Sequence, residues 1–264
     1  MLHQLENIIK EAAQIMVNKT PEGIITKEGH ANFVTEADQA TQDFLQEKLL
    51  ALLPGSVLFG EEKENEPLTN APTWVVDPID GTLNYIHGLK HSAVSIALVR
   101  DKQVQLACIY NPYRDELFTA QLGKGAWLNG QPIRCSDTPF ERALVFYGTS
   151  PYNASLVDAT FRAVASLMKK TADIRRFGSA VLDLAYIACG RADLFFEYSL
   201  SPWDYAAGKL VVTEAGGVFK TLNFTGDALD FSAPAAVFVS NPACEEAGFP
   251  IVQKEYAAWQ AQRR

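Results

Sequence analysis

The chain has 264 residues, of which 48% are hydrophobic and 20% are charged, a composition typical of a globular protein and not of a disordered or fibrous one. Its 31 acidic residues outnumber its 23 basic residues, which gives a formal net charge of −8. This acidic balance, without long runs of Lys or Arg, argues against nucleic acid and anionic membranes as partners. The basic pair Arg175–Arg176 is interpreted as a solvated helix end.

The first half of the sequence predicts two amphipathic helices followed by strands. Apolar residues recur at three- and four-residue spacing between Leu2 and Val17, which is typical of a helix with one buried face. A second helix should follow Thr35, which forms a capping-box pattern with Asp38, and should end near Pro54. Short apolar runs then predict strands at 57–59, 74–76, 92–99, 104–110 and 116–120, the last three as an antiparallel meander, and 124–130 is interpreted as a turn-rich connection.

After about Asp137 the pattern changes to alternating strands and helices. The helix around 206–215 should end at Gly216-Gly217. A mixed α/β fold with two sub-domains, residues 1–137 and residues 138–264, fits this pattern best. Strands are expected at 144–147, 174–177, 192–197, 218–220 and 236–239, and helices at 156–169, 179–189, 206–215 and near the carboxyl terminus.

The four cysteines form no C-x-x-C pair and no zinc-like pattern with histidine, so a reduced, cytoplasmic protein is expected. The polar amino terminus shows no signal peptide, and no apolar run approaches the roughly 18 residues of a membrane span. Cys108 and Cys189 lie in apolar runs and are interpreted as small core residues.

The segment from Trp74 to Thr82 carries the strongest chemical signal. An apolar strand runs directly into Asp77 and Asp80, and Pro78 between them stiffens the turn that aims both carboxylates. Gly81 lets backbone approach a bound anion closely, so its amide and that of Thr82 would cradle a phosphate oxygen. Carboxylates and substrate phosphate are the usual ligands of Mg²⁺. The alternative is a capped strand-to-helix turn in which the aspartates bind only backbone amides.

Two more acidic positions follow apolar runs in the same manner. Glu61 comes after the run 57–59, and Asp204 precedes the expected helix 206–215. Taken singly, Glu61 is interpreted as a solvated charge and Asp204 as a helix N-cap. Together with Asp77 and Asp80 they suggest one metal site, although spacing alone does not show that they converge.

Three segments in this order resemble the inositol monophosphatase family. They are Phe59-Gly60-Glu61-Glu62, the segment from Trp74 to Thr82, and Trp203-Asp204 with Glu214-Ala-Gly-Gly217. The order and spacing match from Lys27 to Gly217. The resemblance implies a layered α-β-α-β-α sandwich of the inositol monophosphatase or fructose-1,6-bisphosphatase type. It also implies a lithium-sensitive, Mg²⁺-dependent phosphatase that is usually a homodimer, with sub-domain 1–137 binding the metals and sub-domain 138–264 completing the active site.

The same resemblance implies metal ligands by position. Glu61, Asp77 and the backbone carbonyl of Ile79 would hold a first Mg²⁺, and Asp77, Asp80 and Asp204 a second, with Glu61 also helping to hold a weaker third ion. Asn32 and Leu83 depart from residues that many members carry, which affects substrate detail and no implied ligand.

Catalytic and substrate roles follow from the resemblance as well. Asp38 and Thr82 would form a dyad that polarises the attacking water, so Asp38, Glu61 and Thr82 are the implied catalytic residues. The implied substrate contacts are Asp80, Gly81, Thr82, Ala180, Glu197 and Asp204.

Glu197 follows the apolar run 192–196, so a strand-end position near the metals is expected. Its carboxylate would accept hydrogen bonds from vicinal hydroxyls and repel a second phosphate. The alternative is a surface glutamate that caps the loop 198–201. His87 and His91 are interpreted as structural or surface residues, with contact at the substrate rim as the alternative.

These inferences predict hydrolysis of inositol monophosphate, or of a related small polyol or sugar phosphate, by water that two Mg²⁺ ions activate. Fructose-1,6-bisphosphatase, adenosine 3′,5′-bisphosphate nucleotidase and histidinol phosphatase share this metal motif and remain alternatives. A metal-binding regulatory protein on the same fold is the non-enzymatic alternative.

Overall fold

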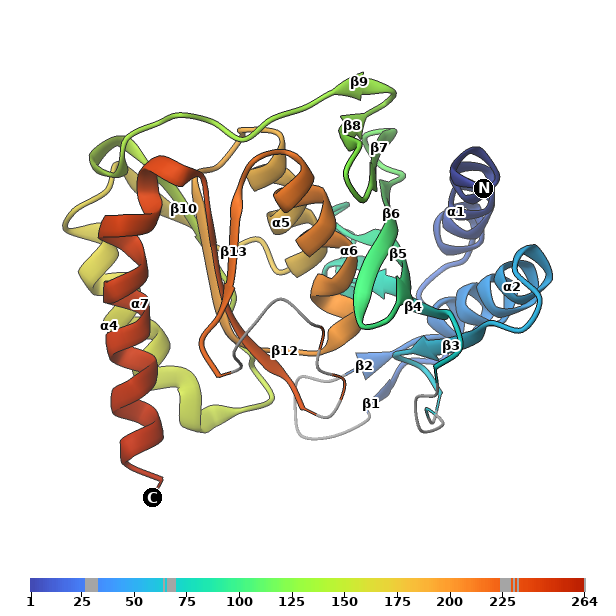
Figure 1. The fold of residues 1–264 in the computed structure, drawn as a ribbon. Helices are drawn as coiled ribbons and strands as arrows, with labels where there is room; N and C mark the ends of the chain where they lie inside the picture. Colours follow the sequence, from blue (N-terminus) through green and yellow to red (C-terminus); the bar gives the residue numbers. More distant parts are fainter. Residues whose placement is uncertain are drawn as a thin grey trace.

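The computed structural model describes residues 1–26, 33–63, 65, 70–223, 229, 231 and 233–263. Within these residues, helices and sheets stack in five alternating layers (Figure 1). The α-β-α-β-α sandwich expected from the sequence is therefore confirmed. The outer helices on the first sheet are α1 (Leu2–Asn18) and α2 (Glu36–Leu52), the middle layer is α5 (Ala180–Ala188) and α6 (Pro202–Glu214), and the outer helices on the second sheet are α4 (Val157–Met168) and α7 (Pro242–Ala261).

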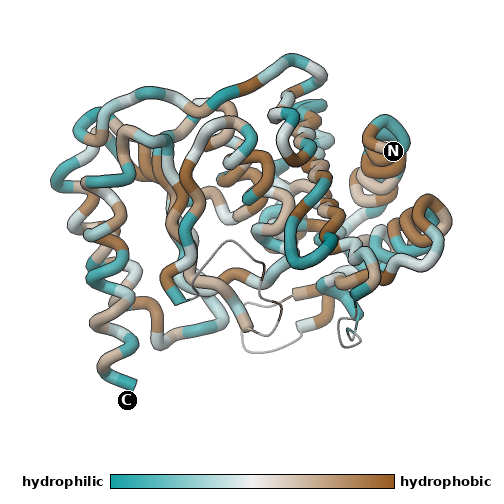
Figure 2. Tube along the Cα trace, viewed as in Figure 1, coloured by the Kyte–Doolittle hydropathy of each residue, from teal (hydrophilic) through white to brown (hydrophobic). Residues whose placement is uncertain are grey.

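The first helix pair forms as the sequence predicts. Leu5, Ile9 and Met16 are fully buried along one face of α1, which packs on α2 and the first sheet. At the start of α2, Thr35 and Asp38 form the expected capping box. Hydrophobic and hydrophilic residues alternate along the outer helices in Figure 2, as expected for helices with one buried face.

In the described part of the chain, the first sheet has seven strands in chain order, and its only parallel pair is β3–β4. Strand β4 extends past the predicted strand 74–76 and includes Asp77 and Asp80. Its pairing with β5 shifts register between these two aspartates. The strands are β3 (Val57–Gly60), β4 (Thr73–Asp80), β5 (Ala93–Arg100), β6 (Gln103–Asn111), β7 (Glu116–Gln121), β8 (Gly125–Leu128) and β9 (Gln131–Pro132).

The prediction of a turn-rich connection at 124–130 is wrong for residues 125–128, which form β8. This segment pairs with β7, so that Trp127 lies opposite Thr119. The carboxylate of Glu214 accepts hydrogen bonds from the amides of Gly123 and Gly125, both at 2.7 Å. A distant helix therefore fixes the turn that lets this glycine-rich segment pair as a strand.

The second sheet has the strand order β11-β10-β12-β14-β13. It mixes parallel pairs around β10 with antiparallel pairs around β14. The strands are β10 (Leu144–Tyr147), β11 (Asp173–Arg175), β12 (Leu194–Leu200), β13 (Val218–Thr221) and β14 (Ala235–Ser240). The short 3-10 helices Phe140–Arg142 and Ala154–Leu156 flank β10, and β1 (Ile25–Thr26) pairs with β2 (Phe33–Val34) in a separate small sheet.

The middle helices α5 and α6 pack against both sheets. Their buried side chains form one core with residues of both sheets. Gly208 of α6 allows close packing on α5, because a Cβ there would lie 2.4 Å from Leu184 Cδ1. The boundary at residue 137 falls between β9 and β10, and the division into two sub-domains stays a prediction. No helix in the described part of the chain is long and apolar enough to cross a membrane.

Candidate metal and phosphate site

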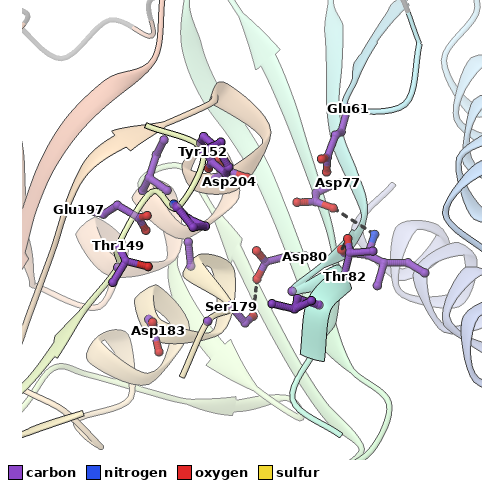
Figure 3. A pocket seen from close by; sticks show the side chains of 18 of the residues that line it. Glu61, Asp77, Asp80, Thr82, Thr149, Tyr152, Ser179, Asp183, Glu197 and Asp204 are labelled. Carbon is purple, nitrogen blue, oxygen red and sulfur yellow. Dashed lines mark hydrogen bonds between the residues drawn. The ribbon is translucent and has the colours of Figure 1, made fainter. Parts of the chain in front are cut away.

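One pocket lies where the carboxyl end of β4 faces α5, α6 and β12 (Figure 3). A single basic side chain, Arg176, lines this pocket among the described residues, against six carboxylates. Such an imbalance of charge requires cations or bound protons. The carboxylates are those of Glu61, Asp77, Asp80, Asp183, Glu197 and Asp204.

Three of these carboxylates converge closely. Asp77, Asp80 and Asp204 each place one oxygen so that all three oxygens lie within 4.8 Å of one another. Asp77 accepts a hydrogen bond from the amide of Ile79 at 3.0 Å, which orients it at the end of β4. Asp204 accepts one from the amide of Ser201 at 2.7 Å.

Asp204 lies inside a helix and not before one. The sequence predicts that this helix begins at residue 206, whereas α6 begins at Pro202. Ser201 and Asp204 form a capping box, and proline at the first helical position has the right φ and needs no hydrogen-bond acceptor. The first turn of α6 therefore aims Asp204 at β4.

Mutual repulsion and burial shift the ionisation of the converging acids. Burial first, and then the charge of Glu61, raises the pKa of Asp77 and of Asp204 well above the ordinary value. Burial also raises the pKa of Asp80 to about 7, although hydrogen bonds oppose that shift. Glu61 follows β3 and points toward Asp77 in Figure 3. Closely spaced carboxylate oxygens are the donor set that a hard divalent cation such as Mg²⁺ prefers, so these residues fit a metal site.

Asp38 and Thr82 meet at the edge of this cluster. The hydroxyl of Thr82 lies 3.3 Å from Asp38 Oδ1 and 3.0 Å from the carbonyl oxygen of Ile79, and can donate to either. The other oxygen of Asp38 accepts the amide and hydroxyl protons of Thr35, so the capping box that starts α2 also fixes Asp38 toward Thr82.

Gly81 connects β4 to the short helix α3 (Thr82–Ile86) in a left-handed conformation, with φ of +81°. A Cβ at this position would lie 3.1 Å from the carbonyl oxygens of Gly178 and His91. The turn therefore requires glycine both for its conformation and for its space.

The amino end of α5 is hydrogen-bonded to the carboxylate of Asp80. The hydroxyl of Ser179 and the amide of Val181 both donate to Asp80 Oδ2, the latter at 3.1 Å. Ala180 lies between these donors and lines the pocket, as its predicted substrate role requires.

Glu197 lies within β12 and is only 7% exposed. The alternative of a surface glutamate capping the loop 198–201 is therefore wrong. Its Oε1 accepts hydrogen bonds from the amide and hydroxyl of Ser150, at 2.8 and 3.0 Å. Burial raises the pKa of Glu197 to about 7, and the bonds from Ser150 oppose that shift.

Sequence reasoning missed several residues of the pocket wall. Asp183 is buried in α5, and its Oδ1 has no hydrogen-bond partner among the described residues. A single acid inside the apolar run 181–188 was the signal that could have found it. Arg176 is exposed, as expected, but it follows β11 and not a helix, and its guanidinium packs on Gly178 and lines the pocket. Thr149 and Tyr152, which carried no motif, also line it (Figure 3).

His91 packs among aromatic rings, whereas Leu83, which departs from the family pattern, lines the pocket. His91 is half-buried against the rings of Phe177 and Tyr186, and burial lowers its pKa to about 4. Leu83 lines the pocket and is 40% exposed. Asn32 and Lys27 lie outside the described residues. The roles of all predicted site residues as metal ligands, catalysts or substrate contacts stay predictions.

Comparison with known proteins places the chain in a family. A model of the inositol monophosphatase family matches residues 2–257. Nus factor SuhB of Escherichia coli (strain K12) is 39% identical over 234 residues, which are 85% of this chain and 87% of that protein. Inositol monophosphatase 3 of Solanum lycopersicum is 42% identical over 200 residues, 73% of this chain and 75% of that protein. The solved structure of Thermotoga maritima IMPase matches with a TM-score of 0.85 at 28% identity, covering 96% of each chain. The chain belongs to the inositol monophosphatase family.

Proposed function

We propose that this protein is a Mg²⁺-dependent phosphomonoesterase that hydrolyses inositol monophosphate or a related small polyol or sugar monophosphate. The observation that carries the proposal is the convergence of Asp77, Asp80 and Asp204 beside the Asp38–Thr82 contact. Homodimerisation and inhibition by lithium, which the family resemblance implies, are part of the proposal.

The metal site would be built from the converging carboxylates. Asp77 would be shared between two cations, with Glu61 and the carbonyl of Ile79 completing one set of ligands and Asp80 and Asp204 the other. When bound, Mg²⁺ would neutralise the phosphate and lower the pKa of a water molecule. The oxygen donors and their crowding support this assignment.

Asp38 and Thr82 would orient the attacking water. When the Thr82 hydroxyl donates to Asp38, its oxygen keeps a lone pair that would accept a hydrogen bond from the water. The amides of Gly81 and Thr82 would face a phosphate oxygen at the start of α3.

The far wall of the pocket supports a substrate with free hydroxyls. Glu197, Asp183 and Thr149 offer oxygen acceptors there, and Arg176 is the one cation among the described lining residues. Acceptors of this kind bind hydroxyl donors and repel a second phosphate group, which favours a polyol monophosphate over a bisphosphate. A fructose bisphosphate, a nucleotide bisphosphate and histidinol phosphate are therefore the comparison substrates.

A second candidate function is that of a regulatory protein. The relative from Escherichia coli, 39% identical, bears the name Nus factor and not that of an enzyme. The same fold would then serve as an interaction surface, and the carboxylates would bind metal without turnover.

A phosphate-release assay separates these functions. We expect Mg²⁺-dependent hydrolysis, with inositol monophosphate the best of the esters named above and with lithium inhibiting. Asp204→Asn should abolish turnover because it removes the negative charge of one of the three converging carboxylates, whereas Asp158→Asn, an exposed change on α4, should not. A purified protein that binds Mg²⁺ but hydrolyses none of these esters would favour the regulatory function.

A further inference from the structure

We propose that Gly148 and Ser150 are positioning residues that hold Glu197 in the orientation needed to accept a hydrogen bond from a substrate hydroxyl. This inference rests on the proposed function and deepens it, because it assigns the recognition of the leaving alcohol to the segment 148–152. That segment follows β10, the strand that pairs with β12, on which Glu197 lies.

Ser150 fixes one oxygen of Glu197. Its amide and hydroxyl both point at Oε1, and its hydroxyl is also 3.0 Å from the carbonyl oxygen of Ser199. Ser150 is buried and has φ of +42°, a left-handed conformation that is strained for a residue other than glycine. The chain therefore maintains a strained residue at the point where both of its donors meet the carboxylate.

Gly148 leaves space for the other oxygen. A Cβ on this residue would lie 1.8 Å from Glu197 Oε2, a distance at which no side chain can coexist with the carboxylate. The φ of Gly148 is not in the left-handed region. Position 148 therefore requires glycine because of the space that the carboxylate occupies, and not because of backbone conformation.

Glu197 keeps free acceptor capacity and lines the pocket. Among the described residues, the two hydrogen bonds donated to its side chain both end on Oε1. An ionised carboxylate has about four acceptor sites, so Oε2 keeps the capacity to accept a hydroxyl proton. Glu197 lines the same pocket as the Asp77–Asp80–Asp204 cluster, and Figure 3 shows it across the pocket from Asp80.

The test compares two esters that differ in the leaving group. Inositol monophosphate carries hydroxyls next to the phosphoester, and p-nitrophenyl phosphate carries none. Ser150→Gly removes the hydroxyl while it keeps the amide and permits the positive φ. We expect the ratio of kcat/KM for inositol monophosphate to kcat/KM for p-nitrophenyl phosphate to fall about 10- to 150-fold, the scale of one hydrogen bond to a charged group.

Two further variants make the test independent of folding defects. Gly148→Ala should lower the same ratio, because the methyl group displaces the carboxylate. Ser155→Gly, at an exposed serine of the same connection, should leave the ratio unchanged. In a Glu197→Gln background, Ser150→Gly should have little additional effect if it acts through Glu197.

An equal loss on both esters, or an undiminished effect of Ser150→Gly in the Glu197→Gln background, would overturn the inference and leave the proposed function standing. Failure of the wild-type protein to hydrolyse either ester in Mg²⁺ would overturn the proposed function and, with it, this inference.

Discussion

At the scale of single residues, the site brings together acids whose ionised forms are disfavoured by burial and by the charges of their neighbours. Asp77 is buried and Asp204 is half-buried, and burial first, then the charge of Glu61, raises the pKa of each. Buried carboxylates without a counter-charge lower the stability of the fold, and a bound cation removes that cost. Substitution of one acid therefore has opposite effects on stability and on metal binding.

Asp77→Asn is expected to raise the melting temperature of the metal-free protein and to abolish its stabilisation by Mg²⁺. Asparagine is the same size, and its carbonyl oxygen can still accept the Ile79 amide. For a chain of this length, 1 kcal/mol corresponds to about 2–4 °C. Thermal unfolding in EDTA and in Mg²⁺ measures both effects, with Asp158→Asn as the surface control. An unchanged response to Mg²⁺ would remove Asp77 from the metal site.

Thr82→Ala is expected to lower kcat by about 10²–10⁴, because the water loses the oxygen that orients it. Thr82→Ser keeps the hydroxyl and should retain most activity. Stabilisation by Mg²⁺ should persist in both variants, since the hydroxyl of Thr82 is bonded to Asp38 or to Ile79. Steady-state kinetics of the two variants, measured side by side, test the role of the hydroxyl. Equal kcat values for Thr82→Ala and Thr82→Ser would exclude the hydroxyl from the mechanism.

At the scale of elements, two turns determine where the chemistry lies. The Gly81 turn joins β4, which carries Asp77 and Asp80, to α3, which begins with Thr82. The capping box of α6 places Asp204 in the first helical turn, where the helix dipole favours a negative charge. Local hydrogen bonding thus orients Asp77 and Asp204, whereas Asp80 is held by Ser179 and Val181 at the start of α5.

Gly81→Ala and Gly55→Ala form a matched pair that separates conformation from contact. Both glycines have φ of +81°, but a Cβ on Gly55 meets no atom within 4 Å, whereas one on Gly81 meets two carbonyl oxygens at 3.1 Å. Both variants should lose about 1 kcal/mol from the backbone conformation alone. Only Gly81→Ala should also lower phosphatase activity, because Thr82 must shift with its turn. Denaturant unfolding measures the loss of stability, and kcat measures the loss of activity. Equal activity in both variants would contradict the role of the Gly81 turn in placing Thr82.

At the scale of the whole molecule, the pocket lies where both halves of the chain meet around the middle helices. Asp77 and Asp80 come from the first sheet, Glu197 comes from the second, and Asp204 comes from α6 between them. The charge of the pocket is therefore a property of the assembled layers, and so is its response to pH.

The stability of the metal-free protein should fall as the pH rises from about 5 to about 8. Asp80 and Glu197 have pKa values raised to about 7, so the folded protein keeps protons that the unfolded chain has already released. A folded state that binds more protons loses stability with increasing pH. Mg²⁺ binds the ionised carboxylates, so its stabilising effect should increase over the same interval. Melting temperatures at several pH values, with EDTA and with Mg²⁺, test this, and a metal-free protein that becomes more stable with pH would contradict it.

Much of the fold could be predicted from the sequence because the signals are local. The periodicity of α1, the capping box at Thr35 and the apolar runs of the strands each depend on residues within a few positions of one another. The motif around Asp77 and Asp80 likewise follows from one strand and its turn. The local patterns predicted a mixed α/β fold, and the resemblance of the motif segments to the inositol monophosphatase family implied the layered sandwich.

Other features were decided only by tertiary structure. The turn before the strand 125–128 is held by Glu214, far along the chain. The burial of Glu197, its bonds from Ser150 and the place of Asp183 in the pocket depend on packing between layers. Sequence patterns report hydrogen bonds between near neighbours, whereas convergence of side chains depends on how hydrophobic faces of distant elements are buried against each other. For that reason the sequence by itself determined which acids to consider, and the packing of the five layers determined which of them meet.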